Sequence, residues 1–310
     1  MKQISEFYLG VEGGATKSTA ILADGERILA QRTGKSLSYH NIGEAAVKKN
    51  LQTLLSPFLK KGSGTKLYAV LGFAGLDTKR DKEIYRKIVG SVLPKNSVFE
   101  VVNDAHIALE ARCPGEQNRI LVISGTGSTV LGQSKNKEAK SIGWDFLFGD
   151  EGSGYEIGTK VLKSAIQSWD GRIQKTVLED LVLKEAHCKT MEEFMPKIYH
   201  MFRNQPGALK HSVADFGKII DQALEQNDWR AREIRDEAVA GLLQGVRAVA
   251  QRLDIQDARF CIGLMGSVWK MPGLKEQFKK AVGKEFPLAL FSEKQEPGAW
   301  GAILLAKKLT

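Results

Sequence analysis

The chain has 310 residues, 43 % of them hydrophobic, which predicts roughly two globular domains, and it holds no apolar run of about 18 residues that would suggest a membrane span. Its net charge of +9 favours anionic ligands, but the basic residues are scattered among 36 acidic ones, a pattern that does not favour nucleic-acid binding. Cys113, Cys188 and Cys261 are odd in number and far apart, which argues against a disulfide framework and fits a reducing cytoplasm.

The first third of the chain reads as strands that alternate with helices, and no signal-peptide apolar region precedes the first strand. Asp24–Gly25, between the second and third strands, is a strong hairpin signal. Strands are predicted at 7–11, 18–23, 27–32, 66–73 and 98–102. Helices are predicted at 43–60 and 79–92 from their apolar spacing, and a short helix is expected after residues 103–105.

The same pattern then begins again. Strands are predicted at 119–124, 130–133, 259–265 and 287–291, a largely helical stretch at 155–256, and a last helix at 298–308. Both halves start with a strand, a turn of small residues and a second strand, which suggests a duplicated unit led by a β-hairpin. This order of elements predicts an α/β fold with mixed sheets.

Three glycine-rich turns each follow an apolar strand. They read G-V-E-G-G-A-T-K-S at 10–18, S-G-T-G-S-T at 124–129 and G-L-M-G-S at 263–267. Turns of this kind expose backbone N–H groups and small hydroxyls that suit phosphate oxygens. None matches a P-loop or a dinucleotide-binding fingerprint. One such turn is usually only a hairpin, whereas three in this order indicate a nucleotide site.

Residues 143–154, G-W-D-F-L-F-G-D-E-G-S-G, place Asp150 and Glu151 between glycines. Carboxylates in such a position can accept hydrogen bonds from sugar hydroxyls or hold a hydrated cation. The alternative is a tight turn with an acidic helix N-terminus, which favours Asp and Glu for electrostatic reasons alone.

Asp104 ends a predicted strand and opens a helix. A carboxylate there is often only a helix cap. The functional alternative is a general base at the carboxyl edge of a sheet, where ligands of α/β proteins gather and where a sugar hydroxyl could be activated to attack a γ-phosphate.

Together these motifs resemble the BadF/BadG/BcrA/BcrD ATPase family, and within it the N-acetylglucosamine kinase-like sugar kinases of the actin/hexokinase/Hsp70 superfamily. The matching motifs are the three glycine turns, V-N-D-A, G-W-x-x-x-x-G-D-E-G-S-G and the closing P-G-A-W-G-A, in family order from residue 10 to 302. The resemblance implies two ribonuclease H-like (actin/hexokinase-type) domains. The first would span 1–117 and be completed by 298–310, and the second would span 118–297 and carry the helical insertion.

The resemblance also assigns roles to residues, with Mg-ATP held between the two domains. Asp104 would be the catalytic base, and Glu12 would orient Mg²⁺ through water. Nucleotide and phosphate contacts would come from Gly13, Gly14, Thr16, Lys17, Gly125, Thr126, Gly127, Ser128, Gly263, Gly266 and Ser267. Sugar contacts would come from Trp144, Asp150 and Gly154, although Trp144 could instead be a core aromatic residue.

The chain departs from the family pattern in one loop. The kinases carry G-x-S-x-N there, and this chain reads G-K-S-L-S-Y-H-N at 34–41. Ser38 aligns with the family's sugar-contacting Asn, and Asn41 lies three residues further on, so either could make that contact. The role of His40 stays open.

The sequence therefore predicts an ATP- and Mg²⁺-dependent kinase that phosphorylates an amino sugar such as N-acetylglucosamine or glucosamine. One alternative is an activator ATPase, which needs two cysteines per subunit for a shared iron–sulfur cluster, yet Cys188 has no partner at short spacing. Another is a non-catalytic sugar sensor. The sugar, a homodimeric state and the role of residues 170–235 are left open.

Overall fold

The computed structural model describes residues 6–25, 27–61, 66–204 and 209–310. These residues form two compact units. The first unit contains the described residues up to Glu116 together with Ser292–Thr310, and the second contains Gln117–Phe291. The chain therefore leaves the first unit after about a third of its length and returns to it at the C-terminus.

A five-stranded sheet forms the centre of the first unit, in the order β3-β2-β1-β4-β5. Its strands are β1 (Glu6–Gly13), β2 (Lys17–Asp24), β3 (Arg27–Lys35), β4 (Lys66–Phe73) and β5 (Val98–Asn103). The first three run antiparallel to one another, and β4 and β5 run parallel to β1. The predicted hairpin at Asp24–Gly25 is confirmed by the pairing of β2 with β3.

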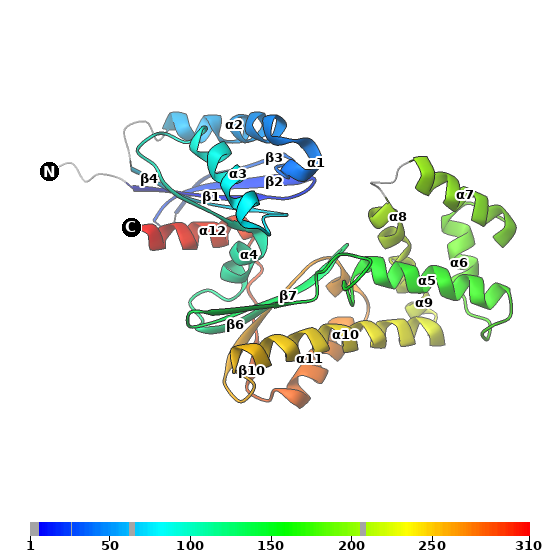
Figure 1. Cartoon of the computed structure of the whole chain (residues 1–310). Helices are drawn as coiled ribbons and strands as arrows, with labels where there is room; N and C mark the ends of the chain where they lie inside the picture. Colours follow the sequence, from blue (N-terminus) through cyan, green and yellow to red (C-terminus); the bar gives the residue numbers. More distant parts are fainter. Residues whose placement is uncertain (1–5, 26, 62–65, 205–208) are drawn as a thin grey trace. The chain divides into compact units, whose positions relative to one another are not determined.

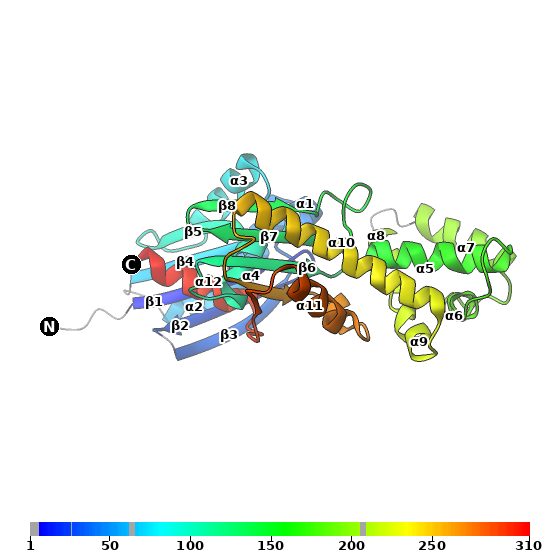
Figure 2. The ribbon, with the colours of Figure 1, turned by 90° about the horizontal axis from the view of Figure 1, so that it is seen from below.

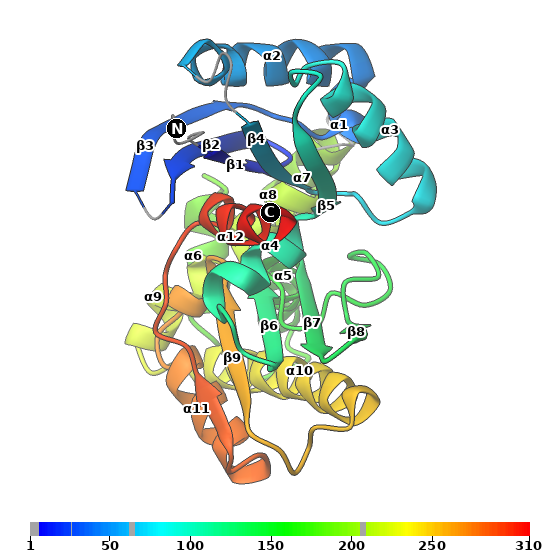
Figure 3. The same ribbon diagram turned by 90° about the vertical axis from the view of Figure 1, so that its left-hand side faces the viewer.

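Helices cover both faces of this sheet (Figure 3). The helices are α1 (Tyr39–Ile42), α2 (Glu44–Lys61), α3 (Lys79–Gly90), α4 (Asp104–Arg112) and α12 (Gly298–Ala306). One core joins the sheet to α2 and α3, and a second joins its opposite face to α4 and α12. A Cβ atom at Gly301 would lie 1.9 Å from the carbonyl oxygen of Ile107, so the small residues of α12 allow its close packing on α4.

The second unit repeats this topology. Its sheet has the order β10-β9-β6-β7-β8, and its strands are β6 (Asn118–Ser124), β7 (Ser128–Ser134), β8 (Lys137–Ser141), β9 (Phe260–Met265) and β10 (Ala289–Phe291). Two antiparallel pairings and two parallel pairings recur in the same places as in the first unit. Two mixed sheets with flanking helices confirm the predicted fold class.

Most of the second unit's helices lie between β8 and β9 (Figure 1). They are α5 (Gly154–Trp169), α6 (Leu178–Glu185), α7 (Met191–Asn204), α8 (Leu209–Phe216), α9 (Ile219–Glu225) and α10 (Trp229–Leu253). The long helix α10 contacts β6, β7 and β8 and also reaches α5 and α9 (Figure 2). It therefore joins the helical insertion to the sheet of its own unit.

Each predicted strand and helix is present, but among the α-helices and strands of the described residues three are missing from the prediction. They are α1, β8 and α11 (Leu274–Glu285). Strand β8 is a polar edge strand in which only Ala139 is buried, so it lacks the apolar alternation that marks a strand. Helix α11 buries Leu274, Phe278 and Val282 at a spacing of four, a signal that the sequence does contain. In the part of the chain that is described, no helix is long and apolar enough to cross a membrane.

Candidate active site

The first glycine turn is the tip of the β1–β2 hairpin. The Gly14 N–H donates to the carbonyl of Lys17 at 3.0 Å, and the Gly14 carbonyl accepts from the N–H of Leu37 at 3.2 Å. Gly13 is buried against Phe73, whereas Thr16 and Lys17 are exposed. The four residues predicted to approach phosphate thus lie in one tight turn. A backbone hydrogen bond closes this turn, and the side chains of Thr16 and Lys17 are exposed.

Glu12 lies at the N-terminus of α12, the helix of the closing P-G-A-W-G-A motif. Burial raises the pKa of Glu12, while the backbone N–H groups of Ala299 and Gly298 donate to its carboxylate and act in the opposite direction. A Cβ atom at Gly298 would lie 2.9 Å from the Glu12 Cδ, so glycine at this position leaves room for the carboxylate. The role of the motif was not visible in the sequence, because its contact partner lies almost 300 residues away.

Asp104 is the first residue of α4, but it is not the helix cap. The cap is Asn103, whose side chain accepts from the Ala105 N–H at 2.9 Å. Burial, followed by the negative charges of Glu12 and Asp77, raises the pKa of Asp104 to about 6, although the Ala105 N–H partly offsets these effects. A carboxylate of this kind is still largely ionised at pH 7, and it takes up a proton more readily than an ordinary Asp.

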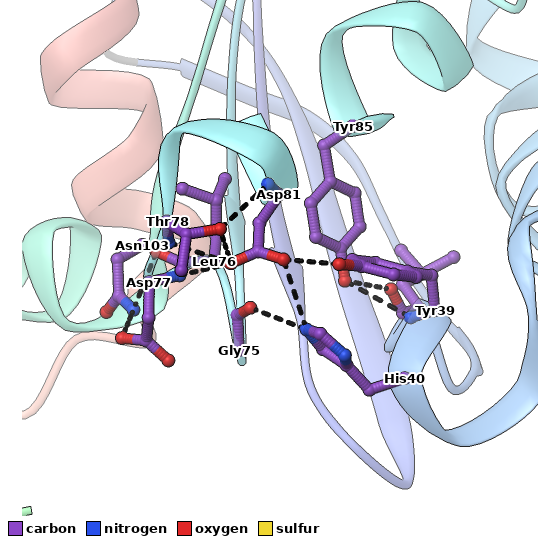
Figure 4. Close-up of polar contacts among 10 residues, drawn as sticks. Tyr39, His40, Gly75, Leu76, Asp77, Thr78, Asp81, Tyr85 and Asn103 are labelled. Atoms are coloured by element: carbon purple, nitrogen blue, oxygen red, sulfur yellow. Dashed lines mark hydrogen bonds and ion pairs between the residues drawn. The ribbon is translucent and has the colours of Figure 1, made fainter. Parts of the chain in front are cut away.

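Asp81, near the start of α3, is the centre of a polar network in the first unit (Figure 4). Its carboxylate accepts hydrogen bonds from the Tyr39 hydroxyl and from both the N–H and the hydroxyl of Thr78, the latter two at 2.7 Å. Burial alone would raise the pKa of Asp81, but the hydrogen bonds from Tyr39 and Thr78 lower it to about 2. This carboxylate therefore stays charged and fixes the start of α3 against Tyr39.

The same network forms hydrogen bonds to residues in the segment 37–40, which includes Ser38 and directly precedes Asn41. The Tyr85 hydroxyl donates to the carbonyl of Leu37 at 3.0 Å and accepts from the Tyr39 N–H at 3.3 Å. His40 Nε2 lies 3.1 Å from the Gly75 carbonyl oxygen and 3.4 Å from the Asp81 carboxylate. His40 is thus part of the network in Figure 4 rather than an isolated loop residue.

Ser38, which directly precedes α1, and Asn41, which lies in α1, differ in exposure. Ser38 is buried, and its N–H donates to the Ser36 hydroxyl at 3.2 Å. Asn41 is exposed. The network then continues towards the candidate base, because Asn103 Nδ2 donates to the Leu76 carbonyl at 3.3 Å and to Asp77 Oδ1 at 3.2 Å. A chain of hydrogen bonds therefore connects this segment to the residue that precedes Asp104.

In the second unit, the second glycine turn packs against the G-W loop, which comprises residues 143–154. The Gly154 N–H donates to the Gly125 carbonyl at 2.7 Å, and the Tyr155 N–H donates to the Thr126 carbonyl at 3.2 Å. The hydroxyls of Ser124 and Ser128 each donate, at 2.7 Å, to a carbonyl within residues 151–152. These bonds bring Gly125, Thr126, Gly127 and Ser128 together with Gly154.

The third glycine turn also meets the second one. A Cβ atom at Gly266 would lie 2.0 Å from the Ser124 carbonyl oxygen and 2.9 Å from the Gly125 N atom. Gly266 has a φ of 116°, a conformation that L side chains rarely adopt. Gly266 and Ser267 are exposed, whereas Gly263 is buried in β9. Gly266 is therefore required by close backbone packing as well as by its φ angle.

The G-W loop presents its large apolar side chains to the surface. Trp144 is 71 % exposed and Phe148 is 82 % exposed, so Trp144 is not a core residue. The loop is closed by backbone hydrogen bonds, with the N–H groups of Gly143 and Trp144 donating to the Gly149 carbonyl at 2.7 and 3.1 Å. Phe146 makes an edge contact with Tyr155 of α5.

Asp150, at the end of this loop, is buried and forms an ion pair. Its Oδ2 atom lies 2.7 Å from the Nζ of Lys210, which belongs to α8 of the helical insertion. A Cβ atom at Gly127 would lie 2.7 Å from Asp150 Oδ2 and 3.1 Å from Lys210 Nζ, so the ion pair borders the second glycine turn. Glu151 is exposed and does not share this environment.

Sequence reasoning missed Lys210, Asp81 and Gly298 as parts of these arrangements. Lys210 and Gly298 contact partners far along the chain, and only the fold reveals such contacts. Asp81 carried a local signal, since Thr78 and Asp81 form a capping box at the start of α3.

The three cysteines lie in separate elements. Cys113 is buried at the end of α4 in the first unit, Cys188 lies between α6 and α7, and Cys261 lies in β9. Over the described ranges, no three His, Cys, Asp or Glu residues are grouped as a metal site would require. The cysteine positions thus add no support to the iron–sulfur alternative.

Comparison with solved structures shows that other two-domain α/β proteins share this fold. A candidate N-acetylglucosamine kinase from Chromobacterium violaceum is 18 % identical, with a TM-score of 0.74 over 98 % of this chain and 100 % of that chain. At this identity the likeness defines the fold alone.

The family model of the BadF/BadG/BcrA/BcrD ATPase family matches residues 9–306, and the chain belongs to this family. It is 30 % identical to an N-acetylmuramic acid/N-acetylglucosamine kinase from Clostridium acetobutylicum, over 97 % of this chain and 98 % of that protein. It is 26 % identical to an N-acetyl-D-glucosamine kinase from Dictyostelium discoideum, again over 97 % and 98 % of the two chains. The resemblance predicted from the motifs is therefore confirmed.

Proposed function

We propose that the protein is an ATP-dependent kinase that phosphorylates a hydroxyl group of an amino sugar of the N-acetylglucosamine or glucosamine type. The full-length similarity to sugar kinases of its family supports this activity. The single observation that carries the mechanism is Asp104, a carboxyl with a pKa of about 6 that follows β5 and does not cap its helix.

In this mechanism Asp104 is the general base. It takes the proton from the sugar hydroxyl as that oxygen forms a bond to the γ-phosphorus of ATP. The bond between the γ-phosphorus and the bridging oxygen breaks, and ADP leaves. Because phosphoryl transfer depends mainly on positioning and charge stabilisation, a base with a pKa near 6 suits the single proton transfer that the reaction needs.

The glycine turns would bind the nucleotide. Gly13, Gly14, Thr16 and Lys17 in the first unit, and Gly125, Thr126, Gly127 and Ser128 in the second, form tight turns that suit phosphate oxygens. Gly263, Gly266 and Ser267 would border the adenosine. The exposure of Thr16, Lys17, Gly266 and Ser267 supports these assignments.

Glu12 fits a role in orienting Mg²⁺ through water. Its carboxylate accepts from two backbone N–H groups, and the positive charges of Lys17 and Arg112 also favour its ionised form. A carboxylate with this donor set can accept hydrogen bonds from the water shell of a cation. When bound, Mg²⁺ would neutralise charge on the phosphates.

The sugar would bind at Asp150, Trp144 and Gly154, with Ser38 or Asn41 as a further contact. Asp150 has a second carboxylate oxygen besides the one paired with Lys210, and this oxygen can accept a hydroxyl hydrogen bond. The exposed face of Trp144 suits the apolar face of a sugar ring. Asn41 is exposed and Ser38 is buried, which favours Asn41 for a direct contact.

A panel of amino sugars and neutral hexoses, assayed by coupled ADP detection, tests the proposal. Sugar-dependent ADP formation with an amino sugar is expected. ADP formation that is independent of sugar would favour an activator ATPase, and sugar binding without ADP formation would favour a sensor.

A further inference from the structure

The Asp150–Lys210 ion pair has a consequence for which sugars can bind. Asp150 is buried, and the Lys210 side chain is only 29 % exposed, so this pair is shielded more than a surface ion pair. Lys210 also lies over the Phe146 ring, at 5.6 Å from its centroid. The ammonium group is therefore fixed at the meeting point of the G-W loop and the second glycine turn.

The position of Lys210 is set by close packing of α8 on α5. A Cβ atom at Gly158 of α5 would lie 1.9 Å from the carbonyl oxygen of Val213 in α8. Gly217, just after α8, approaches Gly154 in the same way, since its Cβ atom would lie 2.8 Å from the Gly154 carbonyl oxygen. These glycine contacts hold α8 against the helix that begins at the G-W loop, so Lys210 reaches Asp150 from a rigid support.

We propose that Lys210 is a specificity-determining residue of the sugar site. By pairing with Asp150 it cancels the charge of that carboxylate, so that the site binds neutral or acidic amino sugars without a preference for a positive charge. This inference rests on the proposed function, in which Asp150 contacts the sugar. Without Lys210, the isolated carboxylate would attract a cationic sugar and repel an anionic one.

A charge series of amino sugars tests the proposal. Glucosamine carries a protonated amine, N-acetylglucosamine is neutral, and N-acetylmuramic acid carries a carboxylate. The value of kcat/KM is measured for each by ADP detection, and a sugar that is not phosphorylated is measured as a competitive inhibitor. ATP KM is measured alongside, and thermal unfolding checks that each variant is folded.

Four variants separate charge from structure. Lys210→Met removes the charge, Lys210→Gln removes the charge but keeps a hydrogen-bond donor, and Lys210→Arg keeps the charge. Lys218→Met is the matched control, because Lys218 forms an exposed ion pair with Asp215 at 2.7 Å in the turn after α8.

Lys210→Met and Lys210→Gln should both lower the preference for the acidic over the basic sugar by about tenfold or more, since the two sugars differ by two charges. Lys210→Arg and Lys218→Met should keep the wild-type order, and ATP KM should not change. Equal losses for all three sugars would overturn the proposal, as would a main effect on ATP KM, which would assign Lys210 to the nucleotide phosphates. If wild type neither phosphorylates nor binds any of the sugars, the proposed function itself fails.

Discussion

The two units share one strand order, but their candidate site carboxylates lie in different surroundings. In the first unit, Glu12 and Asp104 are half-buried near each other, and burial raises the pKa of both. In the second unit, Asp150 is buried in an ion pair with Lys210. A group that must accept a proton benefits from a raised pKa, whereas a group that only binds benefits from a fixed charge and partner. The repeated topology thus surrounds the candidate carboxylates of the two units with different partners.

The first hairpin turn of each unit shows a second contrast. In the first unit the turn ends in exposed Thr16 and Lys17 side chains. In the second unit the equivalent turn, Gly125–Gly127, is enclosed by the G-W loop and by Gly266. The same hairpin turn therefore has exposed side chains in the first unit, whereas in the second unit its backbone is packed against other segments.

Removing the proposed base should have the largest effect. Asp104→Asn keeps the shape but cannot take up the hydroxyl proton, so sugar-dependent ADP formation should fall by roughly 10²–10⁴-fold. Nucleotide binding, measured by equilibrium titration, should persist. Full turnover by this variant at its pH optimum would show that Asp104 is not the base.

Gly266 tests whether the enclosed turn depends on glycine. Gly266→Ala places a methyl group 2.0 Å from the Ser124 carbonyl oxygen at a φ of 116° and should lower the free energy of unfolding by about 2–4 kcal/mol. Gly283→Ala in α11 is the control, because a Cβ atom there meets nothing within 4 Å. Denaturant unfolding should show a large loss in the first variant and a small gain in the second. Similar stability in both would mean that the turn rearranges freely.

Asp150→Asn tests the binding role of the paired carboxylate. A hydrogen bond to a charged group contributes about 1.5–3 kcal/mol, so sugar KM should rise about ten- to hundredfold while ATP KM stays nearly unchanged. Asp215→Asn, which breaks the exposed pair with Lys218, is the control and should leave both values unchanged. The competing role for Asp150 is Mg²⁺ binding. A raised Mg²⁺ requirement at unchanged sugar KM would support that role and contradict ours.

Local signals made much of this molecule predictable. The strands were visible as apolar runs, the glycine turns followed them directly, and Asp104 stood between a strand and a helix. Because the sheet aligns these strand ends, motifs that are separate in the sequence lie together within the second unit. Gly125 and Gly154 are an example, joined by a backbone hydrogen bond of 2.7 Å.

Contacts between distant segments were not predictable from local patterns. Lys210 lies 60 residues from Asp150 in a helical stretch with no distinctive motif. The amides that bind Glu12 come from Gly298 and Ala299, at the other end of the chain. In both cases the sequence shows the partners but not their pairing, because the pairing is a consequence of the completed fold.

The raised pKa of Asp104 predicts a trade between activity and stability. Its folded-state pKa of about 6 lies above the ordinary pKa of 3.8 for an aspartate, so the ionised carboxylate destabilises the fold, and this cost develops as pH rises from about 4 to 6. Asp104→Asn should therefore be more stable than wild type at pH 7, by on the order of 2 kcal/mol, with the difference vanishing near pH 4. Wild-type kcat/KM should fall below pH 6. A stability difference that does not vary with pH would contradict this account.

The smallest effect is expected where the first unit fixes a carboxylate by hydrogen bonds. Tyr39→Phe removes the hydroxyl that donates to Asp81 and should lower the free energy of unfolding by about 1 kcal/mol at pH 7. The pKa of Asp81 is about 2 in the folded chain, below the ordinary pKa of 3.8 for an aspartate, so the stability it provides is present above pH 4 and is lost as pH falls towards 2. The effect of Tyr39→Phe should therefore shrink over that range. Tyr199→Phe, at an exposed position in α7, is the control and should change little at any pH. If Tyr39→Phe costs the same at pH 7 and pH 2.5, the loss does not depend on the charge of Asp81, and this account is contradicted.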